Sequence, residues 1–102
     1  MIVVRTVLQA KFGKAGELAA QSARVNQQLM KEMGTQGKWR ILTDLTGPFD
    51  TLVQEIEVAS LAEWETSRAK LFQQPAFRES FAIMQDLVVS GRNELWNLEA
   101  EG

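Results

Sequence analysis

The stretch from Gly47 to Trp64 constrains the fold of this chain more than any other. Segments 39–45 and 51–58 are both extended in character, and the short run between them, 46–50, is rich in turn-forming residues. This pattern predicts a β-hairpin. Ser60 is followed three residues later by Glu63, a capping box whose hydroxyl and carboxylate satisfy free backbone N–H groups at a helix start. A helix is therefore expected directly after the hairpin.

The first third of the chain predicts a strand and then a helix. Segment 2–9 alternates between two sets of side chains, as a strand does. Apolar residues then recur at steps of three and four from Leu18 to Met33, and Gly34 follows as a C-cap. These features indicate an amphipathic helix with one buried stripe.

The last third of the chain predicts a broken helix and a final strand. Helical spacing continues to Leu71, and Pro75 suits the first turn of a second helical piece. One side of that piece is apolar: Phe77, Phe81, Met84 and Val88. Ser90 and Gly91 are expected to end this helix, which leaves 93–98 for a short strand.

The predicted elements follow the order βαββαβ. This order is typical of an α+β, ferredoxin-like fold with a four-stranded antiparallel sheet. A chain of 102 residues suits a single domain over 1–102, with no internal repeat or linker.

The two faces of such a sheet are expected to differ, because two helices cover only one of them. The alternation assigns one set to the helices: Ile2, Val4, Leu8, Ile41, Leu45, Ile56 and Val58. The other face then carries Val3, Val7, Leu42 and Val53, interleaved with Arg5, Arg40, Asp44, Glu55 and Glu57. A monomer would expose these apolar residues, whereas a second copy stacked through the same face would bury them around a central cavity. A homodimer is therefore expected.

Composition narrows the chemistry that the chain can perform. It contains no histidine, cysteine or tyrosine, so the commonest general base, thiolate nucleophiles and the usual haem ligands are missing. The net charge of −2, with scattered lysines and arginines, argues against nucleic-acid binding. No apolar run is long enough to span a membrane and no signal peptide is evident, so a cytoplasmic location is expected.

The hairpin and helix entry also carry a family resemblance. Residues 46–50, the Glu55-x-Glu57 pair, the segment from Ser60 to Trp64 and Pro75-Ala76-Phe77-Arg78 resemble the NIPSNAP-like branch of the dimeric α+β barrel superfamily. The opening strand with Phe12-Gly13-Lys14 and the closing Glu94-Leu95-Trp96 fit the same plan. The resemblance implies a barrel formed by two chains. It implies no single function, because the superfamily includes cofactor-free monooxygenases, haem-degrading enzymes and isomerases.

The resemblance argues against haem chemistry in this chain. Haem-degrading relatives place an asparagine, a tryptophan and a histidine at positions that fall here on Thr6, Leu71 and Phe81. None of the three matches, so no haem and no other cofactor is expected. The isomerase and cyclase branches rely on a histidine and are excluded in the same way.

The candidate ligand-binding residues are six side chains expected to reach the barrel interior: Arg5, Trp39, Arg40, Asp44, Glu55 and Trp96. An arginine there could hold an enolate or carboxylate, with Glu55 or Asp44 as a base. The competing interpretation is a cross-strand network of ion pairs that neutralises itself. The tryptophans are better interpreted as structural: Trp64 lies on the apolar stripe of its helix and is expected to anchor the core, and Trp39 and Trp96 are expected to pack on their strands. No metal site is expected, because the acidic residues lack ligand spacing.

Three hypotheses remain for function. The leading one is a homodimeric barrel that binds a small, partly apolar molecule inside the barrel, with no assigned reaction. The second is a cofactor-independent monooxygenase acting on a phenol or quinol. The third is a non-catalytic scaffold whose barrel is packed shut. An open cavity bordered by an arginine and a tryptophan favours the first two over the third.

Overall fold

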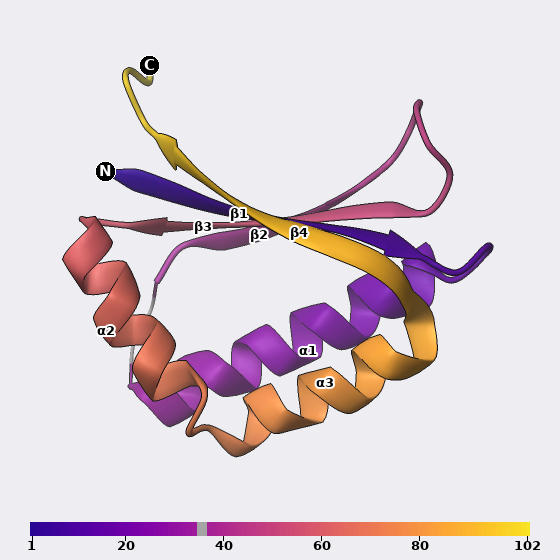
Figure 1. Cartoon of the computed structure of the whole chain (residues 1–102), viewed down its shortest axis with the longest axis horizontal. Helices are drawn as coiled ribbons and strands as arrows, with labels where there is room; N and C mark the ends of the chain where they lie inside the picture. The colour runs from indigo at the N-terminus through magenta and orange to yellow at the C-terminus, as the bar shows by residue number, and fades with distance from the viewer. Residues whose placement is uncertain (35–36) are drawn as a thin grey trace.

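One four-stranded antiparallel sheet and three helices make up the computed structural model of the chain, which describes residues 1–34 and 37–102. The elements are β1 (Ile2–Ala10), α1 (Ala15–Met33), β2 (Trp39–Thr43), β3 (Thr51–Val58), α2 (Leu61–Leu71), α3 (Pro75–Leu87) and β4 (Val88–Asn97). The strand order is β2-β3-β1-β4. All three helices lie on one side of the sheet, and the other side is uncovered (Figure 1). The predicted α+β fold and its βαββαβ order are confirmed.

The core lies where β1 and β3 face α1. Val4 and Leu8 of β1, Leu52 of β3 and Leu18 of α1 are buried, as the alternating pattern predicts. β1 is central because it pairs with β3 on one side and with β4 on the other, in antiparallel register along nearly its whole length. The β1 side chains that alternate with Val4 and Leu8 are Val3, Arg5 and Val7, so these three belong to the open face, where Val7 is buried as well.

The helix ends confirm the predicted start and stop signals. Gly34 adopts φ 65°, the left-handed conformation of a helix C-cap, and its N–H donates to Lys31 O. The N–H of Glu63 donates to Ser60 Oγ at 3.1 Å, and the Glu63 carboxylate accepts from the N–H of Ala59 at 2.9 Å. Pro75 lies in the first turn of α3 and so separates this helix from α2.

Two strand boundaries differ from those predicted. β2 ends at Thr43, so Leu45 lies in the hairpin loop with 99% of its side chain exposed and does not face the helices. α3 ends at Leu87, and β4 already begins at Val88. Ser90 and Gly91 are therefore strand residues, since hydrogen bonding to β1 outweighs their tendency to break local structure. Gly91 is needed there because a Cβ would lie 2.6 Å from Leu8 Cδ2.

The hairpin caps α1 from a distance in the sequence. Lys14 at the N-cap of α1 makes no side-chain hydrogen bond to the helix. Asp50, at the end of the hairpin loop, accepts instead from the N–H of Gly13 at 2.8 Å and from the N–H of Ala15 at 3.1 Å. Asp50 has φ 58°, a left-handed conformation that aspartate and asparagine tolerate better than most residues. One carboxylate thus fastens the β2–β3 hairpin to the start of α1.

Replacing Asp50 with alanine is expected to lower the free energy of unfolding by about 1–3 kcal/mol, because two backbone N–H groups lose a charged acceptor. Asp50→Asn keeps one oxygen acceptor and the tolerance for positive φ, so it should lose less than half as much. Urea unfolding followed by circular dichroism measures both variants. Equal stability of Asp50→Ala and the unmodified protein would contradict this role.

Candidate functional site

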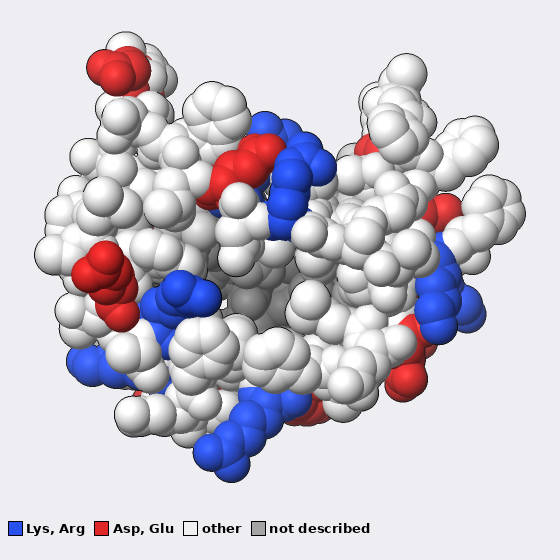
Figure 2. All heavy atoms as spheres, viewed as in Figure 1, with Lys and Arg blue, Asp and Glu red and all other residues white. Residues whose placement is uncertain are grey.

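A cavity of about 340 Å³ lies between the helices and the covered face of the sheet. The space-filling view shows the molecule hollowed there, with a basic side chain bordering the hollow on the side of α2 (Figure 2). Every helix and strand contributes to the lining, and most of the lining surface is apolar. The volume falls at the lower end of the range for small-molecule sites.

Two other hollows are more open to solvent. One of about 440 Å³ lies on the uncovered face of the sheet and is bordered by Arg5 and Arg92. The other, about 340 Å³, lies beside the hairpin and is bordered by Phe12, Asp44 and Phe49. The cavity under the helices is the most enclosed of the three and has the largest apolar lining, so it is the candidate site.

A row of polar side chains crosses the sheet inside this apolar cavity. Thr6 of β1 is paired in register with Gln54 of β3 on one side and with Asn93 of β4 on the other. Thr6 Oγ1 donates to Asn93 Oδ1 at 2.8 Å. Asn26 of α1, which is buried, donates from Nδ2 to Gln54 Oε1 at 2.9 Å. These hydrogen bonds fix polar side chains at positions where an ordinary hydrophobic core would have apolar side chains.

The amide groups of this row have hydrogen-bonding capacity to spare. Each side-chain amide carries two N–H donors, and the bonds given above use only the oxygens of Gln54 and Asn93. Among the described residues, neither Gln54 Nε2 nor Asn93 Nδ2 donates to a protein acceptor. The row therefore offers donors to an oxygen atom of a bound molecule.

Aromatic residues and one arginine form the part of the lining that comes from α2 and α3. Trp64 and Arg68 lie one turn apart on α2, and both line the cavity. Arg68 Cζ lies 5.4 Å from the centroid of the Phe72 ring, within the range of a cation–π contact. Phe77 packs edge-on against Phe72 and Phe81, with ring centroids 5.1 and 5.0 Å apart. These aromatic walls suit a flat or apolar ligand.

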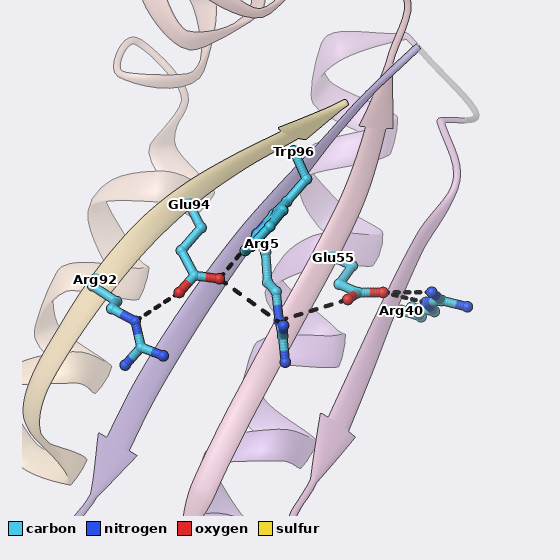
Figure 3. A network of polar contacts seen from close by, with 6 residues as sticks. All are labelled: Arg5, Arg40, Glu55, Arg92, Glu94 and Trp96. Atoms are coloured by element: carbon cyan, nitrogen blue, oxygen red, sulfur yellow. Dashed lines mark hydrogen bonds and ion pairs between the residues drawn. The ribbon is translucent and has the colours of Figure 1, made fainter. Parts of the chain in front are cut away.

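Four of the six predicted site residues lie together on the open face of the sheet. Arg40, Glu55 and Arg5 follow one another across β2, β3 and β1, and Glu94 of β4 continues the row (Figure 3). Glu55 accepts from Arg40 Nε at 2.6 Å and lies 3.7 Å from Arg5 Nε. Trp96 Nε1 donates to Glu94 at 3.0 Å. This is the network of ion pairs that the competing interpretation expected.

The open-face network is not fully satisfied in a single chain. Arg92 donates to Glu94 at 2.8 Å, and the hydrogen bonds from Arg92 and Trp96 hold the pKa of Glu94 below its ordinary value. Arg5 Nε is a buried atom without a hydrogen-bond acceptor among the described residues. Three arginines share two glutamates, so the row carries a net positive charge.

The other two predicted residues lie elsewhere, so the six do not form one site. Trp39 is paired in register with Ile56 and lines the cavity on the helix side, not the open face. Asp44 lies beyond the end of β2 and accepts from the N–H of Thr51 at 2.9 Å, which closes the hairpin. Asp44 is displaced because β2 ends at Thr43, beyond which the alternation of faces no longer applies. Trp39 is adjacent to Arg40 in β2, and neighbouring residues of a strand point to opposite faces. A ligand-binding role for the six remains a prediction.

The polar residues of the cavity were not identified as site residues from the sequence. Thr6, Gln54 and Asn93 each occupy a helix-facing strand position, and Asn26 interrupts the buried stripe of α1. The polar Asn26 within this apolar stripe was the sequence signal that could have indicated a polar site in the cavity. Trp64, interpreted as a core anchor, is only half-buried and lines the cavity, and no hydrogen bond from its indole is present among the described residues.

Over 1–34 and 37–102, acidic side chains nowhere gather in the groups of three or more that could hold a metal ion. No helix in those ranges is long and apolar enough to cross a membrane.

Solved structures with this arrangement include NIPSNAP domain proteins and putative antibiotic biosynthesis monooxygenases. An uncharacterized NIPSNAP domain protein from Burkholderia xenovorans superposes with a TM-score of 0.82 at 13% identity, covering 98% of this chain and 96% of that one. The chain has the NIPSNAP domain fold. A NIPSNAP family protein from Agrobacterium tumefaciens gives 0.77 at 17% identity, covering 94% and 90% of the two chains. The resemblance predicted from the hairpin is thereby confirmed at the level of the fold.

The second group carries a different description. A putative antibiotic biosynthesis monooxygenase from Deinococcus radiodurans superposes with a TM-score of 0.72 at 16% identity, covering 99% of this chain and 95% of that one. No protein-family model matches this sequence, and no curated protein is similar to it. The comparisons therefore show the fold alone and assign no ligand to the cavity.

Proposed function

We propose that this chain binds a small, partly apolar molecule in the cavity between its helices and its sheet. The observation that carries this proposal is the polar row of Thr6, Gln54 and Asn93 inside an otherwise apolar cavity. The free amide donors of Gln54 and Asn93 are not buried, so they can donate either to water or to a ligand that enters the cavity. The aromatic walls supply contact area, and the polar row supplies orientation.

The cavity also weighs against a purely structural scaffold. A protein with a purely structural role needs no cavity, and protein cores are normally packed to high density. Side chains of the sizes already present in this chain could have filled this space. An arginine and two tryptophans, Arg68, Trp39 and Trp64, border the cavity instead. An arginine and a tryptophan at one cavity were the features expected of a binding protein or an enzyme, but the expected place was the barrel interior on the open face, and this cavity lies on the helix side of the sheet.

A titration tests this proposal directly. Addition of 2-naphthol should quench the fluorescence of Trp39 and Trp64 in a saturable way, with one site per chain. A linear, non-saturating change for 2-naphthol and for decanol alike would count against a binding cavity.

We also propose that the functional unit is a homodimer formed through the open face of the sheet. Leu42 of β2 and Trp96 of β4, on the two edge strands of this face, are exposed in the single chain by 44% and 54%. Exposed apolar side chains such as these favour a partner surface, and one self-complementary face is enough to build a symmetric dimer. We expect an interface on the order of 2,000 Å² in total.

Cofactor-independent oxygenation is the second candidate, supported by the solved structure described as a putative antibiotic biosynthesis monooxygenase and by the cationic Arg68 at the cavity. In such a reaction an anthrone anion gives electrons to O₂; one oxygen atom becomes the new carbonyl and the other leaves as water. A cation beside the cavity would stabilise the anion.

Incubation of the protein with anthrone under oxygen tests this second candidate. If the chain is an oxygenase, anthraquinone should form, and Arg68→Ala should slow its formation by about 10²-fold, as loss of an anion-stabilising donor does. Arg5→Ala and Arg40→Ala test the earlier prediction that the open face carries this role. No product above the enzyme-free rate would exclude oxygenation of this substrate class and leave the binding function.

A further inference from the structure

We propose that the cavity is selective for apolar carboxylic acids and that Arg68 binds their carboxylate group. This inference rests on the proposed binding function and adds to it the chemical class of the ligand. Arg68 is the only charged residue among the described residues that line the cavity. A ligand whose body lies against the apolar walls therefore meets a single fixed charge, and that charge is positive.

The charge of Arg68 is not neutralised by the protein. Arg5, Arg24, Arg40 and Arg92 each lie within 4.0 Å of a carboxylate. Arg68 makes no such ion pair within 1–34 and 37–102, although Glu65 is three residues before it on the same helix. Its side chain extends over the Phe72 ring instead. A guanidinium without a protein carboxylate is available to an anionic ligand.

The contact with Phe72 also orients the guanidinium. A cation–π contact fixes the head group near the cavity wall, while its N–H donors remain free to bind an acceptor. Two of these donors match the two oxygens of a carboxylate in a bidentate pair. Phe72 is itself 47% exposed, so the pair would form at the edge of the cavity, where a carboxylate keeps part of its hydration.

The rest of the cavity fits the remainder of such an acid. Apolar and aromatic side chains line most of its roughly 340 Å³, which suits a bicyclic ring or a medium-length alkyl chain. Gln54 and Asn93 provide neutral donors, which can bind a keto or hydroxyl oxygen but do not compensate a full negative charge as an arginine does. The carboxylate is therefore assigned to Arg68, and the amides to any second oxygen.

Matched pairs of ligands test this inference. We would measure binding of 2-naphthoate against 2-naphthamide, and of decanoate against decanamide, by isothermal titration calorimetry at pH 7. Each amide keeps the shape of its acid and lacks the charge. At least one acid should bind about 10-fold more tightly than its amide, because a charge-assisted pair at a partly exposed site contributes on the order of this factor.

Variants of Arg68 distinguish the effect of its charge on ligand affinity from the effect of its packing. Arg68→Gln should abolish the preference for the acid and leave amide binding within about twofold, whereas Arg68→Lys should keep part of the preference. Arg78→Gln is the matched control, because Arg78 is exposed on α3 and does not line the cavity. It should leave both affinities unchanged.

The possible outcomes distinguish the acid selectivity from the proposed binding function on which it rests. Equal binding of acid and amide in both pairs to the unmodified protein would overturn the role of Arg68 and leave the binding cavity standing. A preference that survives in Arg68→Gln would also overturn that role. Absence of binding for all four ligands would count against both the acid selectivity and the binding function.

Discussion

Combined replacement of Leu42 by glutamate and Trp96 by glutamine is expected to convert a dimer into a monomer. Both side chains are about half exposed in the single chain, so polar residues there should leave the chain itself folded. The dimer would lose four apolar side chains from its interface. At about 1 kcal/mol or more for each, its dissociation constant should rise on the order of 10³-fold.

Sedimentation velocity at micromolar concentration measures this change, with circular dichroism to verify that the variant is folded. Lys31→Glu serves as the control, because Lys31 lies on α1, on the opposite side of the sheet, and should leave the dimer intact. A monomeric mass for the unmodified protein under these conditions would refute the homodimer.

Filling the cavity with a larger side chain is expected to cause the second large effect, a loss of affinity for the ligand. Ser22 on α1 lines the cavity and is half-buried, so Ser22→Trp places a large indole in the space reserved for ligand. Affinity for 2-naphthol should fall at least 10-fold, because the ligand can enter only by displacing the indole. The free energy of unfolding should stay the same or rise, since an existing void is filled.

Gln28→Trp is the matched control for this experiment. Gln28 lies on the exposed side of the same helix and does not line the cavity, so the same substitution there should leave affinity unchanged. Full affinity in Ser22→Trp, measured by titration calorimetry, would mean that the ligand binds elsewhere.

The order of the elements could be predicted because its signals are local. Alternation in 2–9, the Ser60–Glu63 capping box and Gly34 each act within a few residues, and each is confirmed. The start of β4 was wrong because it depends on a distant strand: pairing with β1 keeps Ser90 and Gly91 extended. Leu45 was misplaced because alternation was continued past the end of β2.

The candidate site was only partly predictable, because it combines residues that are far apart in the sequence. The pairing of Arg5 with Glu55 could be anticipated from strand alternation. Arg92 lies before the predicted strand over 93–98, so its contact with Glu94 depends on the greater length of β4. Thr6, Gln54 and Asn93 come from three strands. Each alone is an ordinary polar residue, and only the register of the sheet makes them one row.

A two-dimensional ¹H–¹⁵N NMR titration with 2-naphthol tests the central claim most directly, because the three tryptophans lie on different faces. The indole N–H signals of Trp39 and Trp64, which line the cavity, should shift with saturation, as should the side-chain amides of Gln54 and Asn93. The indole of Trp96, on the open face beside Glu94, should not move. Shifts confined to Trp96 and the backbone around Arg5 would place the ligand on the open face and contradict the cavity as the binding site.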